Sequence, residues 1–319
     1  MKTVNNTGCS GVLILKVDEE DVNTIFLNTD YDDNTVLQYA YDNFANMFSE
    51  NVLEYAFAYA QVPPTQITRK LREAAQSMIK LHDIQKLRNY LTDNVPEEDW
   101  DTDFLRWYEK KGIFGEVILH LFLKEFKATI PLISKLYFKD SFAQEAKGFD
   151  SVHVSANGET LWLGETKFYR AWKKHGVVKG GIDELVEDLK KHFTKDYLSE
   201  QYVIIKRGLE TEYEHPQRAA WIEKLNKPIL LKDVFQYIRI PLLCVYEDGI
   251  AQDYLQPISE AAKNAGIITH TTAVRDYYNS INTFPHKEQV ETLLILMPIE
   301  AKRKIVKCML EKMWHMQNI

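Results

Sequence analysis

The sequence predicts an α/β fold with a mixed central sheet flanked by helices, preceded by a mainly helical N-terminal region. Three observations support this expectation. Continuous apolar runs typical of buried strands occur at 241–247 and 292–298. Asn157-Gly158 is the dipeptide most typical of a tight hairpin turn, so two further strands should flank it. Helical patterns precede and follow the hairpin, and this order from residue 103 onward is that of a mixed α/β core.

Length, charge and cysteine content narrow the class of protein. The 319 residues suffice for one large domain or two compact ones. No apolar run is long enough to span a bilayer, and the N-terminus lacks the apolar segment of a secretory signal. The three cysteines are far apart and odd in number, which favours neither a disulfide framework nor a thiolate zinc site. We therefore expect a protein of the reducing cytoplasm without a membrane partner.

The N-terminal part of the chain is acidic. Residues 1–60 hold ten acidic and two basic residues, a net of −8 within a total of −7. Such a surface is either merely solvated, or it repels DNA or docks on a basic partner. Its expected elements are a strand at 11–17 and helices at 36–60 and 65–91. The acidic stretch TDNVPEEDWD then marks a boundary near residue 100, which divides an acidic, mainly helical region (1–100) from a core (101–319).

The expected elements of the core mix helices with strands. In chain order they are a helix at 103–127 broken near Gly112, a strand at 132–139, the hairpin at 149–169, an amphipathic helix opened by Gly180-Gly181 with acids in its first turn, a helical insertion at about 200–238, the two apolar strands, and a C-terminal helix from about Glu300. Strands that lie between helices in this way favour a sheet covered by helices.

Two acids lie at matching distances from the hairpin turn. If Asn157 and Gly158 are the two loop residues, the numbers of paired residues sum to 315, and Asp150 faces Glu165. Their Cβ atoms would then be roughly 4.5–5.5 Å apart. Strand side chains alternate between faces, so Lys167 shares a face with Glu165. Like charges directly opposite each other destabilise a sheet, and a lysine or a divalent cation beside them would offset the repulsion.

The residues alone leave two interpretations of this cluster open. Paired carboxylates with a lysine can hold Mg²⁺ against a phosphodiester, where the cation polarises the phosphoryl oxygen and activates water. The lysine would then orient that water or stabilise the developing charge. A solvated salt-bridge cluster on a half-exposed hairpin would have the same composition.

A basic stretch follows the second strand of the hairpin. It contains Arg170, Lys173, Lys174 and Lys179, alongside Tyr169 and Trp172. Such a stretch would hold the DNA backbone, because phosphates supply affinity that does not depend on sequence. Exposed loops are also often rich in lysine without binding any ligand.

The residues around the hairpin resemble a known superfamily. Asp150 before one strand and Glu165-Thr166-Lys167 on the next resemble the PD-(D/E)xK nucleases, although Phe149 stands where the motif has proline. The runs GEVILHLFLKEF, SKLYFKDSFAQEAKGFDSVHV and LWLGETKFY are similar to the HamA family, the nuclease subunit of the Hachiman anti-phage defence system. Residues 1–100 contain no motif that contributes to this resemblance.

The resemblance implies a chemistry and a partner. It implies that Asp150, Glu165 and the Thr166 carbonyl bind the catalytic metal, that Lys167 is the catalytic lysine, and that Glu116 supports a metal directly or through water. The implied cofactor is Mg²⁺, with Mn²⁺ as a substitute, and the implied reaction is endonucleolytic cleavage of DNA. A HamB-like helicase would restrain the nuclease and release it on aberrant or phage DNA.

A second hypothesis is a non-catalytic DNA-binding or helicase-docking module on the same fold. The net negative charge favours it, because a free nuclease usually attracts DNA. The intact set of Asp150, Glu165 and Lys167 argues against it. The chain carries neither a Walker A lysine motif nor a Rossmann glycine fingerprint, so we do not expect it to be the ATP-driven helicase itself.

Overall fold

The computed structural model describes most of the chain. The described residues are 1–8, 10–57, 63–79, 81–93, 95–96, 100, 103–105, 108, 112–133, 148–169, 177–211, 215–227 and 230–318. Within these ranges, no helix is both long and apolar enough to cross a membrane. Of the cysteines in these ranges, Cys244 is buried and Cys308 is half-buried.

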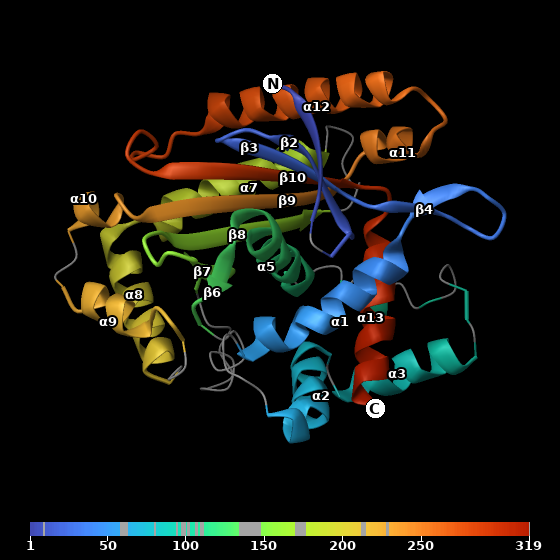
Figure 1. The fold of residues 1–319 in the computed structure, drawn as a ribbon, viewed down its shortest axis with the longest axis horizontal. Helices are drawn as coiled ribbons and strands as arrows, with labels where there is room; N and C mark the ends of the chain where they lie inside the picture. The colour runs from blue at the N-terminus through green and yellow to red at the C-terminus, as the bar shows by residue number, and fades with distance from the viewer. Residues whose placement is uncertain are drawn as a thin grey trace.

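One mixed sheet of eight strands organises the described part of the chain (Figure 1). The order across it is β1-β2-β3-β10-β9-β8-β7-β6. The inner strands β3, β10, β9 and β8 run parallel, and the strand pairs at both edges are antiparallel. The strands are β1 Thr3–Thr7, β2 Leu13–Asp18, β3 Val22–Leu27, β6 Thr129–Pro131, β7 Ser151–Ser155, β8 Leu161–Tyr169, β9 Ile238–Glu247 and β10 Glu291–Ile299. The predicted α/β fold with a mixed central sheet is confirmed.

The N-terminal region begins with strands, so the expectation of a mainly helical region is wrong. β1, β2 and β3 join the same sheet as the strands of the core, and β3 pairs with β10. The sequence does not predict β3, because Asn23 and Thr24 interrupt its apolar run. Both side chains are buried: Asn23 donates to Asp18 Oδ1 at 3.0 Å, and Thr24 Oγ1 lies 2.8 Å from Thr271 Oγ1. Partners in the folded chain therefore take up the NH2 group of Asn23 and the hydroxyl of Thr24, which the sequence marks as exposed.

A short hairpin leads from the sheet to the first helix. Its strands are β4 Thr29–Tyr31 and β5 Leu37–Tyr39, which pair with each other as a separate two-stranded sheet. The side chains of Tyr31 and Val36 are 67% and 59% exposed. Because β5 takes up the start of the segment predicted as helix 36–60, α1 runs only over Tyr41–Phe57.

The other predicted elements before the hairpin are present with different ends. The segment 65–91 consists of a 3-10 turn η1, Pro64–Gln66, and two helices, α2 Ile67–Met78 and α3 Leu81–Thr92. Helix α5, Ile113–Lys127, begins directly after Gly112, where the sequence predicts a break. The strand expected at 132–139 is wrong at its start, because β6 ends at Pro131; residues 134–139 lie outside the described residues.

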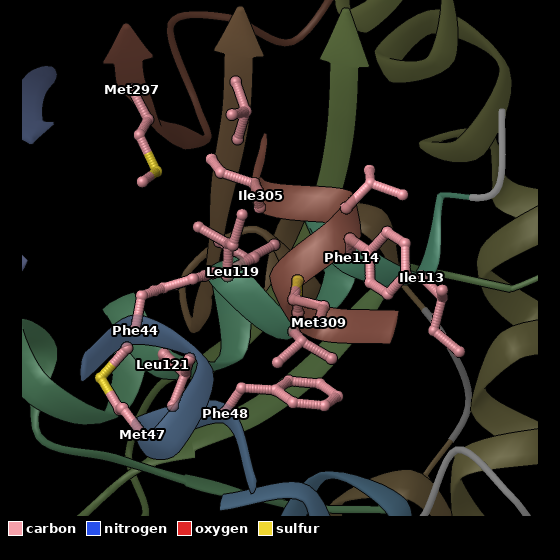
Figure 2. Packing of buried hydrophobic residues seen from close by; sticks show 14 of the residues in the cluster. Phe44, Met47, Phe48, Ile113, Phe114, Leu119, Leu121, Met297, Ile305 and Met309 are labelled. Atoms are coloured by element: carbon pink, nitrogen blue, oxygen red, sulfur yellow. The ribbon is translucent and has the colours of Figure 1, made fainter. Parts of the chain in front are cut away.

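Helices cover both faces of the sheet (Figure 1). One cluster of buried side chains joins α1, α2, α5 and α13 to one face, and a second joins α7, α8 and α12 to the other. Figure 2 shows the first cluster, where Phe48 of α1, Leu119 of α5 and Met309 of α13 pack together. The remaining helices are α7 Val177–His192, α8 Lys195–Thr211, α9 Arg218–Leu225, α10 Leu231–Val234, α11 Gly249–Leu255, α12 Glu260–Ile281 and α13 Lys302–Gln317.

The helices after the hairpin largely follow the sequence. α8 to α10 occupy the predicted helical insertion, and α13 is the predicted C-terminal helix. α7 begins at Val177, three residues before Gly180, so Asp183 and Glu184 do not lie in its first turn as expected. Its predicted apolar stripe from Ile182 to Phe193 is buried against the sheet.

The hairpin has the predicted register but not the predicted turn. β7 and β8 pair Val154 with Leu161 and Ser151 with Gly164, so the numbers of each pair sum to 315 as expected. A type I′ turn would need positive φ at both Asn157 and Gly158, yet only Gly158 has it, at +73°. The amide of Gly158 donates to Ser155 O at 2.8 Å, and the loop spans the four residues 156–159. A four-residue loop centred on the same residues preserves the register because it takes one residue from the end of each strand.

Candidate functional site

Asp150 lies at the start of β7 and is tied to the neighbouring strand. Its Oδ2 accepts hydrogen bonds from the backbone amide of Thr166 at 2.8 Å and from Thr166 Oγ1 at 3.0 Å. The ladder ends one residue earlier, at the pair of Ser151 and Gly164. The side chain of Asp150 therefore reaches past the end of the ladder to Thr166 of β8, the residue that follows Glu165.

Glu165 is a buried carboxylate whose hydrogen-bond partner lies on α7. Its side chain is in the interior, with the residue 3% exposed, and Oε1 lies 2.6 Å from His192 Nδ1. Burial raises the pKa of Glu165, and His192 and Lys167 oppose this shift only in part. Burial acts to lower the pKa of His192, but the hydrogen bond and the charge of Glu165, with Asp188 and Asp150, outweigh burial and raise it.

Lys167 is the positive group of the site. It shares a face of β8 with Glu165, as predicted, and its Nζ forms an ion pair of 2.5 Å with Asp188 Oδ2 of α7. Burial acts to lower the pKa of Lys167, but the hydrogen bond and charge of Asp188, with the charges of Asp150 and Glu165, raise it instead. The ammonium group is therefore held charged among three carboxylates.

Helix α5 approaches β8 from the opposite face of the sheet. A Cβ on Gly115 would lie 3.0 Å from Thr166 Oγ1, so the absence of a side chain there permits the close approach. The next residue, Glu116, accepts a hydrogen bond of 2.6 Å from the hydroxyl of Tyr55 on α1. Burial raises the pKa of Tyr55, and the charges of Glu116 and Asp150 raise it further.

Helix α7 approaches β8 and β9 through a second glycine. A Cβ on Gly181 would lie 2.5 Å from Cys244 Sγ and 3.2 Å from Tyr169, so a side chain there does not fit. Two turns further along α7, Asp188 and His192 meet the side chains of β8. The close contact at Gly181 thus sets the distance between the helix and the carboxylates.

The structure brings the predicted site residues together unevenly. Asp150, Thr166, Glu165 and Lys167 converge at the open end of the hairpin, and Glu116, on the α5 side, is hydrogen-bonded to Tyr55, whose pKa the charge of Asp150 also raises. Of the predicted DNA-binding residues, Lys179 is exposed with its Nζ 4.9 Å from the centre of the Tyr277 ring. Arg170, Lys173 and Lys174 lie outside the described residues.

Three partners of the site escape sequence reasoning: Tyr55, Asp188 and His192. Asp188 and His192 are four residues apart and border the apolar stripe of α7, which is a signal that they lie on one helical face close to the sheet. Nothing in the sequence pairs them with Lys167 and Glu165. Tyr55 carries no sequence signal, because it sits within the apolar pattern of α1.

The donor chemistry of the site suits a hard cation. Among the described residues, no group of three or more His, Cys, Asp or Glu side chains is arranged to hold a metal ion. Mg²⁺ commonly takes only one or two carboxylates and completes its shell with water and substrate phosphates. Asp150 and Glu165 offer two carboxylates, and the Thr166 carbonyl would add a third oxygen ligand. The burial that penalises the charged form of Glu165 would be offset by a cation beside it.

A separate polar chain lies under the sheet on the α5 side. His120 Nδ1 lies 3.0 Å from His153 Nε2, and His153 Nδ1 lies 2.8 Å from Thr129 Oγ1. Burial lowers the pKa of His120 to about 3, helped by the charge of Lys124, and burial also lowers the pKa of His153. His153 pairs with Trp162 on the face away from Glu165, as the hairpin register predicts. These histidines are neutral supports of the fold.

Comparison with known proteins identifies the family. The family model of HamA matches residues 9–313, which is nearly the whole chain, and the resemblance seen in the sequence is confirmed. A search of the curated proteins found no match. The match includes the residues of the hairpin site and the strands β2 and β3. The chain therefore belongs to the HamA family, a component of the Hachiman anti-phage defence system.

Proposed function

We propose that the chain is a Mg²⁺-dependent DNA endonuclease of the PD-(D/E)xK type and the effector of its defence system. The observation that supports this most is the convergence of Asp150, Glu165 and Lys167 at one end of the hairpin. Two acidic groups and one amine from a strand pair are the set that phosphodiester hydrolysis with a hard cation requires.

Each residue has a distinct part in this chemistry. Asp150, Glu165 and the Thr166 carbonyl would hold the metal, with Glu116 supporting it directly or through water. When bound, Mg²⁺ polarises the scissile phosphate and lowers the pKa of water. Lys167, held charged by its acidic neighbours, would orient the attacking water and stabilise the charge that develops on the phosphate oxygens.

The DNA would be held by positive charge next to the site. Lys179 on the first turn of α7 is exposed, and it follows the basic stretch that contains Arg170, Lys173 and Lys174. Phosphate contacts of this kind add affinity without sequence preference. A net charge of −7 opposes DNA binding elsewhere on the chain, which suits an enzyme whose access to DNA is controlled by a partner.

The proposed partner is a HamB-like helicase that restrains the nuclease and releases it on aberrant or phage DNA. The acidic β4–β5 hairpin, with Tyr31 exposed between Asp30 and Asp32, is the proposed contact surface. Deleting residues 1–60 would be a poor test of this contact, because β1, β2 and β3 belong to the central sheet. Substitutions on the β4–β5 hairpin leave that sheet intact.

The alternative is a non-catalytic DNA-binding or helicase-docking module. One observation favours it: Glu165 and Lys167 are already paired with His192 and Asp188. Binding of Mn²⁺ to the purified chain at millimolar concentration discriminates the two functions, since a docking module has no need of the metal.

Cleavage of plasmid DNA tests the proposal directly. We expect the purified chain to cut supercoiled plasmid with Mg²⁺ and to stop when the metal is chelated. Glu165→Gln and Lys167→Met should abolish cutting, whereas Glu159→Gln, an exposed acid in the turn of the same hairpin, should cut normally. Cutting by Glu165→Gln at the natural rate would refute the assigned chemistry.

A further inference from the structure

We infer that Asp188 and His192 of α7 are positioning residues of this site, where His192 sets the orientation of Glu165 and Asp188 sets the place of Lys167. The inference rests on the proposed function, and it extends the site from β7 and β8 to a helix of the second layer. The two contacts that carry it are the 2.6 Å hydrogen bond of His192 and the 2.5 Å ion pair of Asp188.

The two contacts form together because the helix and the strand have matching spacings. Residues four apart on a helix share a face and are separated by about 6 Å along its axis. Residues two apart on a strand share a face and are separated by about 6.6 Å. His192 can therefore face Glu165 while Asp188 faces Lys167, with α7 running back along β8.

His192 restrains one oxygen of a metal-binding carboxylate. Its Nδ1 engages Oε1 of Glu165, and within the described part of the chain Glu165 has no other hydrogen bond, so Oε2 is the oxygen left for a cation. The imidazole is itself fixed: the Tyr197 ring stacks on it at 4.4 Å and 11°, and Phe149 meets it edge-on at 6.0 Å. Because Phe149 directly precedes Asp150, one aromatic cluster supports both acids.

Asp188 restrains the amine. Lysine has a flexible four-carbon stem, so an ammonium group without a partner would sample many positions. The Asp188 carboxylate holds Lys167 Nζ near Glu165 and Asp150, and the charges of both acids raise the pKa of Lys167. Among the described residues, the ion pairs of Asp188 are with Lys167 and Lys191 rather than with the expected metal ligands, so its loss should affect the reaction step more than metal binding.

Metal binding measured by calorimetry with Mn²⁺ alone, without DNA, tests His192. Partners that hydrogen-bond to metal ligands typically contribute 10–100-fold to metal affinity, so we expect His192→Phe, which keeps the aromatic stack, to weaken Mn²⁺ binding by about that factor. His192→Asn places an amide donor near the position of Nδ1 and should recover most of the affinity. Glu187→Gln, an exposed acid on the same helix, is the control and should bind normally.

Asp188→Asn tests the lysine contact by separating two quantities. We expect kcat for plasmid cleavage to fall by more than the Mn²⁺ affinity does. The inference would be overturned if His192→Phe bound Mn²⁺ as tightly as the natural chain does. It would also be overturned if the Mn²⁺ affinity of Asp188→Asn fell by the same factor as its kcat. Should His192→Phe not fold by circular dichroism, the comparison of His192→Asn with Glu187→Gln still decides, because Asn must retain binding. If the natural chain neither binds Mn²⁺ nor cuts DNA, the proposed function itself fails.

Discussion

The contact of α7 with the sheet can be tested by adding a single methyl group at Gly181. The Cβ of Gly181→Ala would lie 2.5 Å from Cys244 Sγ, about 0.9 Å inside the 3.4 Å at which ordinary contacts begin. Cys244 is completely buried on β9, so little free space surrounds its thiol. The helix must therefore shift by roughly 1 Å, and overpacking of this kind costs about 1–3 kcal/mol.

The shift should separate α7 from the side chains of β8. A distance of 2.6 Å between His192 Nδ1 and Glu165 Oε1 would lengthen to about 3.5 Å, beyond the range of a good hydrogen bond. The neighbouring glycine provides the matched control, because a Cβ on Gly180 meets nothing within 4 Å. Replacing a helical glycine by alanine at an open position stabilises by roughly 0.5–1 kcal/mol.

The expected results are opposite in sign for two adjacent residues. In urea unfolding, Gly180→Ala should be slightly more stable than the natural chain, and Gly181→Ala should be less stable by about 1–3 kcal/mol, reduced by the gain in helix propensity. In Mn²⁺ titration, Gly181→Ala should bind more weakly and Gly180→Ala normally. Equal stability and equal Mn²⁺ affinity of the two variants would refute the account of how α7 is positioned.

Two further predictions concern pH and the partner. Burial lowers the pKa of His120 to about 3, so between pH 6.5 and 3 the unfolded chain takes up a proton that the folded chain does not. The free energy of unfolding should therefore fall on acidification, by about 2 kcal/mol at pH 5 from His120 alone. In urea unfolding, His120→Asn should lose less stability between neutral pH and pH 5 than the natural chain does. An equal loss in both would contradict a lowered pKa of His120 in the folded chain. Combining Tyr31→Ser with Asp33→Lys should weaken binding to the helicase in a pull-down titration, whereas Glu223→Lys, an exposed acid on α9, should not. An unchanged affinity in the double variant would exclude the β4–β5 hairpin as the contact.

Several features could be predicted because they depend on local geometry. β9 and β10 are inner parallel strands covered on both faces, so they appear in the sequence as continuous apolar runs. β3 is equally buried but contains Asn23 and Thr24, whose partners Asp18 and Thr271 are known only once the chain has folded. A strand of that kind has no distinct sequence pattern.

In the hairpin, the predicted register is correct although the predicted turn type is wrong. Type I′ and four-residue loops that are centred on the same residues join the strands with the same pairing, so the pairing of Val154 with Leu161 holds for either. What distinguishes them is the φ angle of Asn157, which depends on local hydrogen bonds: Asn157 Oδ1 accepts from the amide of Glu159 at 3.1 Å.

The sequence by itself determined that Glu165 and Lys167 share a face and that Asp150 lies at the level of Glu165, because side chains alternate with a period of two along any strand. Only the tertiary structure decided which groups those side chains contact. His192 and Asp188 come from α7, which packs closely against β8 and β9 at Gly181, and Tyr55 of α1 meets Glu116 of α5, which packs closely against β8 at Gly115. Such contacts depend on how closely two surfaces fit, and no spacing along the chain records that distance.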